Sequence, residues 1–169
     1  MEKNANIIIF YCEKIDIMIA CWLYKELGYQ MKCFITPESL REDSFILGTK
    51  VVNDGFVPDF IVAIWRGGAP IGCYVHELLK IHGINSDHIA IRTSRYTGID
   101  QAESVVKVFN LGYLAERVKP ESKVLLVDDV FDTGISIAGV FDAFKKRFGD
   151  NMPQDIRVAT VHYKPERNQ

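Results

Sequence analysis

The segment VLLVDDVFDTGIS, at residues 124–136, carries side chains that could do chemistry. Four apolar residues lead into Asp128 and Asp129, and a third acid, Asp132, precedes a Thr-Gly-Ile-Ser turn. Two adjacent acids on a strand point to opposite faces, and burying both without partners would cost much free energy. We therefore expect this strand to end at solvent or at a polar ligand.

The small-residue turn that follows the acids is suited to a phosphate group. Residues 133–136 lie where an amphipathic helix is expected to begin, and Gly134 permits backbone angles that other residues avoid. Successive backbone N–H groups at such a helix start attract a phosphate dianion. Because carboxylates repel phosphate, the three acids should contact sugar hydroxyls, a divalent ion or a basic atom.

The elements that must position these residues alternate between strand and helix. Uninterrupted apolar runs at 59–65 and 123–127 predict strands covered on both faces, as in a parallel sheet. Ligands bind such sheets at the carboxyl ends of the strands. Three predicted loops fall at strand ends: WRGGAP (65–70), RTSRYTGIDQAES (92–104) and DDVFDTGIS (128–136).

Two helices have clear sequence signals. Thr36 followed by Pro37 combines a hydroxyl cap with a residue preset for the first helical position, and this helix should run to about Asn53. Between Ile137 and Phe148, large apolar residues recur at the spacing of one helix face. Strands and helices in this alternation predict an α/β fold.

Composition limits the classes of function. The chain has 169 residues, 48% hydrophobic and 25% charged, with a net charge of −2, which gives no support to a general nucleic-acid or anionic-membrane surface. Glu13, Lys14 and Asp16 interrupt the apolar N-terminal run well short of the roughly 20 residues that a membrane span needs. We expect a cytoplasmic protein with one main domain.

Other families also place acids after an apolar strand. A P-loop nucleotidase would need G-x-x-x-x-G-K-[ST], which the sequence lacks. A response-regulator receiver carries its acidic pair near the start of the domain, whereas only about 40 residues follow this one. A plain surface acid pair with a helix cap would explain Asp128 and Asp129 alone, but it does not explain the whole of residues 124–136.

Residues 124–136 resemble the ribose-phosphate-binding signature of type I phosphoribosyltransferases: apolar strand, two acids, two apolar residues, then Asp-Thr-Gly-x-Ser/Thr. IVAIWRGGAPIG (61–72) resembles the pyrophosphate loop of the hypoxanthine/guanine/xanthine branch, and RTSRYTGI (92–99) resembles its mobile catalytic loop. VHYKPERNQ (161–169) resembles the strand end that carries the base-contacting lysine. The resemblance implies the type I phosphoribosyltransferase fold, a mostly parallel twisted sheet flanked by helices.

The resemblance implies a role for each matching residue. Asp132 would remove the proton from the purine N7 as general base. Asp128 and Asp129 would hold the ribose hydroxyls and Mg²⁺, directly or through water. The remaining implied groups are the 5-phosphate loop (Asp132, Thr133, Gly134, Ile135, Ser136), the pyrophosphate loop (Trp65, Arg66, Gly67, Gly68), the mobile catalytic loop (Ser94, Arg95, Tyr96) and the base-binding Lys164. The family commonly has a non-proline cis peptide in the pyrophosphate loop, here Trp65–Arg66.

Two segments depart from the family pattern. The purine branch normally continues past Lys164 into a hood, and because the sequence stops at Gln169 we expect no usual C-terminal hood. Residues 1–34 match nothing in the family pattern and predict a strand, a helix and another strand. We expect this N-terminal addition to occupy the hood's position or to extend the sheet edge, beside a phosphoribosyltransferase core at 35–169.

The resemblance implies a purine salvage enzyme that uses phosphoribosyl pyrophosphate and hypoxanthine, guanine or xanthine, with Mg²⁺ as cofactor. It also implies a homodimer or homotetramer, and we expect no nucleic-acid or membrane partner. The alternative is a non-catalytic regulator of the same fold that senses phosphoribosyl pyrophosphate. Such regulators often have an altered pyrophosphate loop and a basic face, so the intact WRGGAP and the charge of −2 favour the enzyme. The oxopurine-type loop argues against a third alternative, specificity for adenine or a pyrimidine.

Overall fold

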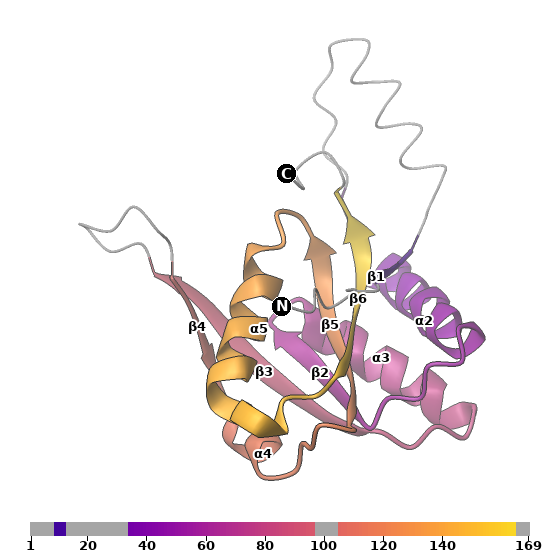
Figure 1. The fold of residues 1–169 in the computed structure, drawn as a ribbon. Coiled ribbons are helices and arrows are strands. Elements are labelled where there is room, and N and C mark those ends of the chain that lie inside the picture. Colours follow the sequence, from indigo (N-terminus) through magenta and orange to yellow (C-terminus); the bar gives the residue numbers. More distant parts are fainter. Residues whose placement is uncertain (1–8, 13–33, 97–104, 165–169) are drawn as a thin grey trace.

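A mostly parallel β-sheet forms the centre of the computed structural model, which describes residues 9–12, 34–96 and 105–164 (Figure 1). Within these residues the sheet has six strands in the order β1-β6-β5-β2-β3-β4. The strands are β1 (Ile9–Tyr11), β2 (Phe60–Trp65), β3 (Asp87–Tyr96), β4 (Val105–Phe109), β5 (Lys123–Phe131) and β6 (Asp155–Tyr163). Neighbouring strands are parallel except for β3 and β4, which are antiparallel. The predicted α/β class is confirmed.

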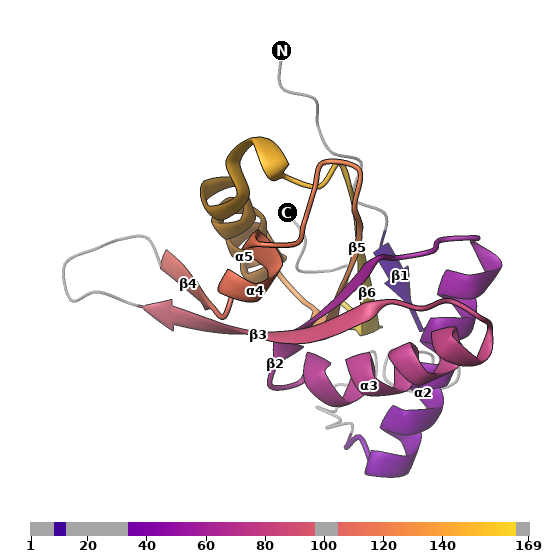
Figure 2. The same ribbon diagram turned by 90° about the horizontal axis from the view of Figure 1, so that it is seen from below.

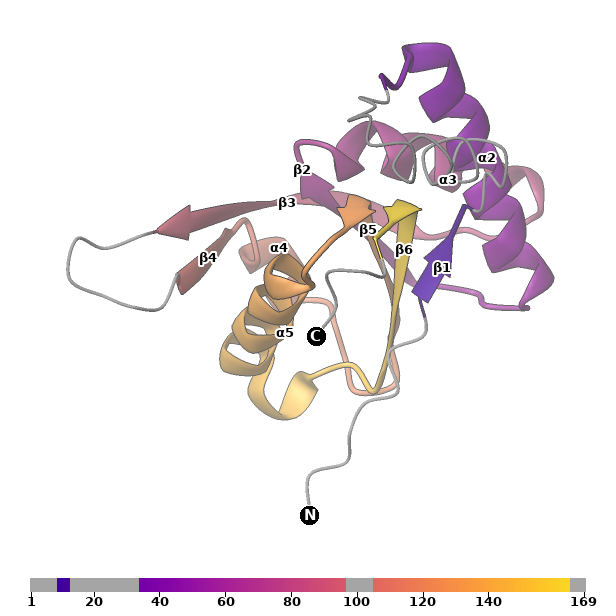
Figure 3. The same ribbon diagram turned by 90° about the horizontal axis from the view of Figure 1, so that it is seen from above.

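Helices cover both faces of the sheet, as the view in Figure 3 shows. The helices are α2 (Pro37–Asn53), α3 (Gly68–Ile81), α4 (Gly112–Ala115) and α5 (Ile135–Phe148), followed by a 3-10 turn, η1 (Gly149–Asn151). α2 and α3 lie on one face, and α4 and α5 lie on the other. Among residues 9–12, 34–96 and 105–164, no helix combines the length and the apolar character that crossing a bilayer requires.

The central strands are buried on both faces, because each face is covered by a helix layer. Along β5, Val124 and Leu126 pack into the core cluster on the α5 side, whereas Leu125 and Val127 pack into the cluster on the α2 and α3 side. All four side chains are at most 1% exposed. The prediction of a parallel-sheet strand from this uninterrupted apolar run is therefore confirmed.

The two helices with clear sequence signals form as expected. Thr36 caps α2 by accepting a hydrogen bond from the Ser39 N–H at 3.1 Å, and the Ser39 hydroxyl accepts one from the Thr36 N–H, which completes a capping box. The helix ends at Asn53, and Gly55 then takes a left-handed φ of 73°. In α5 the expected apolar face is buried at Ile137, Val140, Phe144 and Phe148.

The predicted loop at 92–104 was wrong in its first five residues. β3 continues to Tyr96 because β4 pairs with it, from Arg92 opposite Phe109 to Tyr96 opposite Val105. Figure 2 shows the ends of these two strands projecting from the body of the sheet. Neither β4 nor α4 was predicted from the sequence. Residues 97–104 lie outside the described part of the chain.

The N-terminal strand lies at the sheet edge, where β1 pairs in parallel with β6. Phe10 is buried at 8% exposure in the core cluster on the α2 and α3 side. The helix predicted from DIMIACWLYKELG (16–28) lies outside the described residues. Of the second strand predicted from MKCFI (31–35), only Phe34 and Ile35 are described, and neither belongs to a strand.

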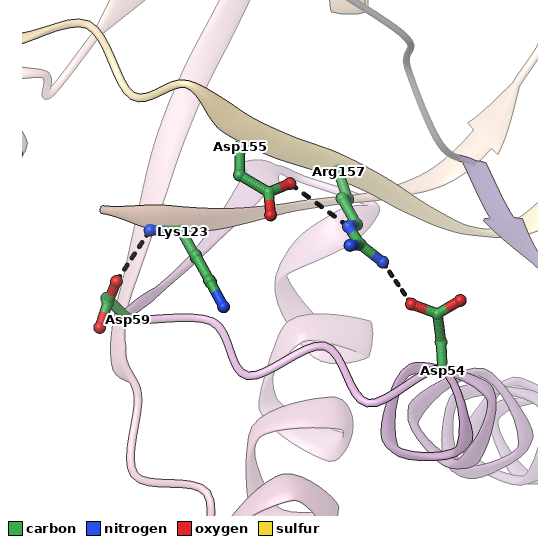
Figure 4. A network of polar contacts seen from close by, with 5 residues as sticks. All are labelled: Asp54, Asp59, Lys123, Asp155 and Arg157. Atoms are coloured by element: carbon green, nitrogen blue, oxygen red, sulfur yellow. Dashed lines mark hydrogen bonds and ion pairs between the residues drawn. The ribbon is translucent and has the colours of Figure 1, made fainter. Parts of the chain in front are cut away.

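A polar network joins α2 to the amino-terminal end of the sheet (Figure 4). The Arg157 guanidinium pairs with Asp54, which caps the carboxyl end of α2, and with Asp155 at 3.3 Å. The same guanidinium lies 4.2 Å from the centroid of the Phe56 ring. Because the Arg157 side chain is only 19% exposed, these contacts are partly shielded from water.

Candidate functional site

A polar pocket of about 610 Å³ lies at the carboxyl ends of β2 and β5. Its lining includes nine of the residues that the sequence singled out: Trp65, Arg66, Gly67, Asp128, Asp129, Asp132, Thr133, Gly134 and Ser136. These residues come from two segments about 60 positions apart in the chain, at the ends of β2 and β5, and the parallel pairing of these strands brings them together. The position agrees with the rule for ligand sites in parallel sheets.

The predicted loop at 128–136 was wrong in its first four residues, because β5 extends to Phe131 and the acidic pair lies within the strand. Asp128 is buried at 9% exposure, and its Oδ1 accepts a hydrogen bond of 2.9 Å from the Asp129 N–H. Burial, and secondarily the negative charge of Asp129, raises the pKa of the Asp128 carboxyl to about 7. A cation entering the pocket would reverse this effect, because it would stabilise the charged carboxylate.

Residues 132–136, the predicted 5-phosphate loop, lead into the start of α5. Gly134 has a left-handed φ of 74° and is the N-cap residue of the helix, and its carbonyl accepts a 2.8 Å hydrogen bond from the Ala138 N–H. The first N–H groups of a helix have no partner within it, and a glycine cap adds no side-chain acceptor. This arrangement leaves backbone donors for an anion. Ile135 is 40% exposed and does not line the pocket.

The pyrophosphate loop packs directly against the acidic pair. The expected non-proline cis peptide, Trp65–Arg66, is present. A Cβ atom added at Gly67 would overlap the carboxylate of Asp129, and one added at Gly68 would overlap the backbone carbonyl of Val127. Two consecutive glycines therefore allow the loop and β5 to approach closely.

The predicted catalytic loop and the predicted base-binding lysine are not among the described residues that line the pocket. Ser94 is half-buried in β3 and is not among the lining residues, and the side chains of Arg95 and Tyr96 lie outside the described part. Lys164 is exposed at the end of β6, where its backbone N–H donates a 2.9 Å hydrogen bond to the Phe131 carbonyl. Phe131 does line the pocket.

Several lining residues were not predicted from the sequence: Ile64, Thr93, Val130, Phe131 and Ile137. Thr93 was missed because β3 was expected to end before it. Had the strand been extended past Arg92, the alternation of side chains along it would have indicated which face Thr93 occupies. Val130 and Phe131 were treated as spacers between acids, although they form the wall between Asp129 and Asp132.

The donor set fits a magnesium ion only in part. Among the described residues, no group of three or more His, Cys, Asp or Glu side chains could hold a metal ion. Mg²⁺ is often held by one or two carboxylates together with substrate phosphates and water. Asp128 and Asp129 supply two carboxylates beside a predicted phosphate site, so they fit this shared mode of binding.

A parallel sheet with a glycine-capped phosphate loop after β5 and a cis-peptide loop after β2 defines the type I phosphoribosyltransferase fold. Residues 37–169 match the family model described as the phosphoribosyl transferase domain. The chain belongs to this family.

Solved structures of similar fold include purine enzymes. A purine phosphoribosyltransferase from Pyrococcus horikoshii is 22% identical, with a TM-score of 0.60, over 79% of this chain and 79% of that one. A hypoxanthine phosphoribosyltransferase from Staphylococcus aureus is 20% identical, with a TM-score of 0.60, over 85% and 73%. A Neisseria gonorrhoeae hypothetical protein with bound ppGpp is 21% identical, with a TM-score of 0.63, over 80% and 74%. No curated protein matches the chain in sequence.

Proposed function

We propose that the protein transfers the 5-phosphoribosyl group of phosphoribosyl pyrophosphate to a 6-oxopurine, with hypoxanthine, guanine or xanthine as acceptor. The products are the nucleoside monophosphate and pyrophosphate. One observation carries the proposal: a single pocket is lined by the acidic pair, the third acid, the phosphate loop and the pyrophosphate loop.

The three acids would act on the sugar and the base. Asp128 and Asp129 would accept hydrogen bonds from the ribose hydroxyls, and Asp132 would take the N7 proton as the bond to N9 forms. When bound with the substrate, Mg²⁺ would neutralise charge on the pyrophosphate leaving group. The raised pKa of Asp128 supports this role for a cation, because burial and the charge of Asp129 disfavour its carboxylate form and a cation would offset both effects.

The loops would hold the two phosphate ends. Backbone N–H groups of residues 133–136 would bind the 5-phosphate, and Arg66 with the Gly67 backbone would bind the pyrophosphate. Ser94, Arg95 and Tyr96 would close over the site and exclude water. Lys164 would donate a hydrogen bond to the exocyclic oxygen of the purine.

The test is a set of separate incubations with phosphoribosyl pyrophosphate, Mg²⁺ and one base: hypoxanthine, guanine, xanthine, adenine or uracil. We expect nucleotide from at least one oxopurine and none from uracil. Nucleotide from adenine or uracil alone would show that the base specificity is wrong. Binding of phosphoribosyl pyrophosphate without nucleotide from any base would favour the second candidate, a regulator.

The regulator is the weaker candidate on the evidence of the site. Its case rests on the fold, which is shared by proteins with different functions. The proposed pyrophosphate loop has the sequence WRGGAP and packs beside Asp129, which supports the enzyme. The N. gonorrhoeae protein of similar fold contains ppGpp, which is in keeping with a pocket for a purine nucleotide.

We further propose that the protein is cytoplasmic and forms a homodimer or homotetramer.

A further inference from the structure

Three aromatic rings form a continuous row across neighbouring strands at the carboxyl end of the sheet. The ring of Tyr11 on β1 lies 5.1 Å from that of Tyr163 on β6, measured between centroids. The ring of Tyr163 lies 5.8 Å from that of Phe131 on β5. The planes are tilted by 32° and 40°, and both spacings are typical of interacting aromatic pairs. We call Tyr11, Tyr163 and Phe131 the aromatic row.

One end of the aromatic row reaches the pocket. Phe131 lines it and directly precedes Asp132. Tyr163, the middle ring, directly precedes Lys164, whose backbone N–H donates to the Phe131 carbonyl at 2.9 Å. Two members of the row therefore directly precede the two residues, Asp132 and Lys164, to which we assign the purine.

The other end of the aromatic row is fixed to α2. The Lys50 ammonium donates a 2.7 Å hydrogen bond to the Tyr11 carbonyl and lies 5.5 Å from the centroid of the same ring. Tyr11 is half-buried, and β1 pairs with β6 up to this residue. Helix α2 and strand β6 thus hold Tyr11 from two sides.

The strand order separates the aromatic row from the pyrophosphate loop. β5 lies between β6 and β2, so the row approaches the pocket from the β6 side, and the pyrophosphate loop follows β2 on the other side. Substitution of Tyr11 should therefore affect the part of the pocket assigned to the base more than the part assigned to pyrophosphate.

We propose that Tyr11 is a positioning residue for purine binding: through Tyr163 and Phe131, the N-terminal edge strand holds Lys164 and the β5 wall in place. The inference rests on the proposed function and deepens it, because it gives β1 a part in recognition of the base. Tyr11 itself need not touch the substrate. Its ring limits the rotamers open to Tyr163, and Tyr163 is covalently followed by Lys164.

The experiment compares two ligands that differ by the base. Calorimetry measures the dissociation constants of guanosine monophosphate and of ribose 5-phosphate for the wild type, Tyr11→Ala and Tyr11→Phe. Tyr11→Ala should weaken nucleotide binding about tenfold and leave ribose 5-phosphate binding within about twofold, since one aromatic contact is lost. Tyr11→Phe keeps the ring and should bind both ligands like the wild type. In turnover, Tyr11→Ala should raise the KM for the base and not that for phosphoribosyl pyrophosphate.

Phe45→Ala is the matched control, because Phe45 is also half-buried and its ring lies 5.6 Å from that of Tyr74, in a contact between α2 and α3. It should lower Tm without selective loss of nucleotide affinity. Equal losses for both ligands in Tyr11→Ala, no loss in either, or the same selectivity in Phe45→Ala would overturn the inference. Failure of the proposed function would be recognised separately, because the wild type would then form nucleotide from no base. The comparison of the two dissociation constants does not depend on turnover.

Discussion

Substitution of Gly67 by alanine tests the contact between the pyrophosphate loop and the acidic pair. The backbone of Gly67 is ordinary for any residue, with φ −63° and ψ −38°, so alanine adds no backbone strain. The new methyl group would instead overlap the carboxylate of Asp129. The carboxylate is the end of a side chain and can rotate away, whereas the Cβ atom of Asp129, 2.8 Å from the new methyl group, can move only with the backbone. A small shift of the backbone would let the fold survive the change.

The larger loss is therefore expected in activity and a smaller one in stability. Forcing an extra methyl group into a packed contact costs about 1–3 kcal/mol. If the displaced Asp129 can no longer hold the sugar, this cost appears as a fall of roughly 5- to 150-fold in kcat/KM for phosphoribosyl pyrophosphate. The assay is the initial rate with varied phosphoribosyl pyrophosphate at saturating base, together with Tm.

Two other glycines, one in α4 and one next to Gly67, provide controls. A Cβ atom at Gly112 meets no heavy atom within 4 Å, so Gly112→Ala should keep both kcat/KM and Tm. A Cβ atom at Gly68 would overlap the backbone carbonyl of Val127, which cannot rotate away, so Gly68→Ala should lower Tm. The reasoning is refuted if Gly67→Ala keeps kcat/KM within twofold of Gly112→Ala, or if its main effect is a loss of Tm like that of Gly68→Ala.

Three further predictions concern single side chains. Asp132→Asn should lower kcat by about 10²- to 10⁴-fold, while the dissociation constant of phosphoribosyl pyrophosphate, measured by calorimetry, changes far less; equal losses would contradict the general-base role. Folding raises the pKa of the Asp128 carboxyl from 3.8 to about 7. Between these two values the native state binds more protons than the unfolded state, so the free energy of unfolding falls as the pH rises toward 7. Asp128→Asn should thus raise the free energy of unfolding at pH 8, by up to about 4 kcal/mol, and the gain should vanish near pH 4; urea unfolding at both values checks this. Arg157→Met should cost about 1–3 kcal/mol in urea unfolding, because it removes the pairing with Asp54 and the contact with Phe56, and an unchanged midpoint would show that the network adds no stability.

Local signals in the sequence were sufficient for the elements that begin or end at distinctive residues. Thr36 and Pro37 begin α2 in a way that requires no distant partner, and the apolar run before Asp128 is buried wherever helices cover both faces. Gly134 likewise has a local reason for its left-handed backbone. The family resemblance added the cis peptide at Trp65–Arg66, which the structure contains.

The sequence alone therefore determined the class of fold and the glycine turn that begins α5, because these depend on periodicity and on backbone chemistry within a few residues. Only the tertiary structure decided which of the predicted site residues share a pocket. The length of β3 depends on hydrogen bonds from β4, and the contact of Gly67 with Asp129 depends on the parallel pairing of β2 with β5. The aromatic row joins Tyr11 to residues about 120 and 150 positions later, and no local pattern can specify such a contact.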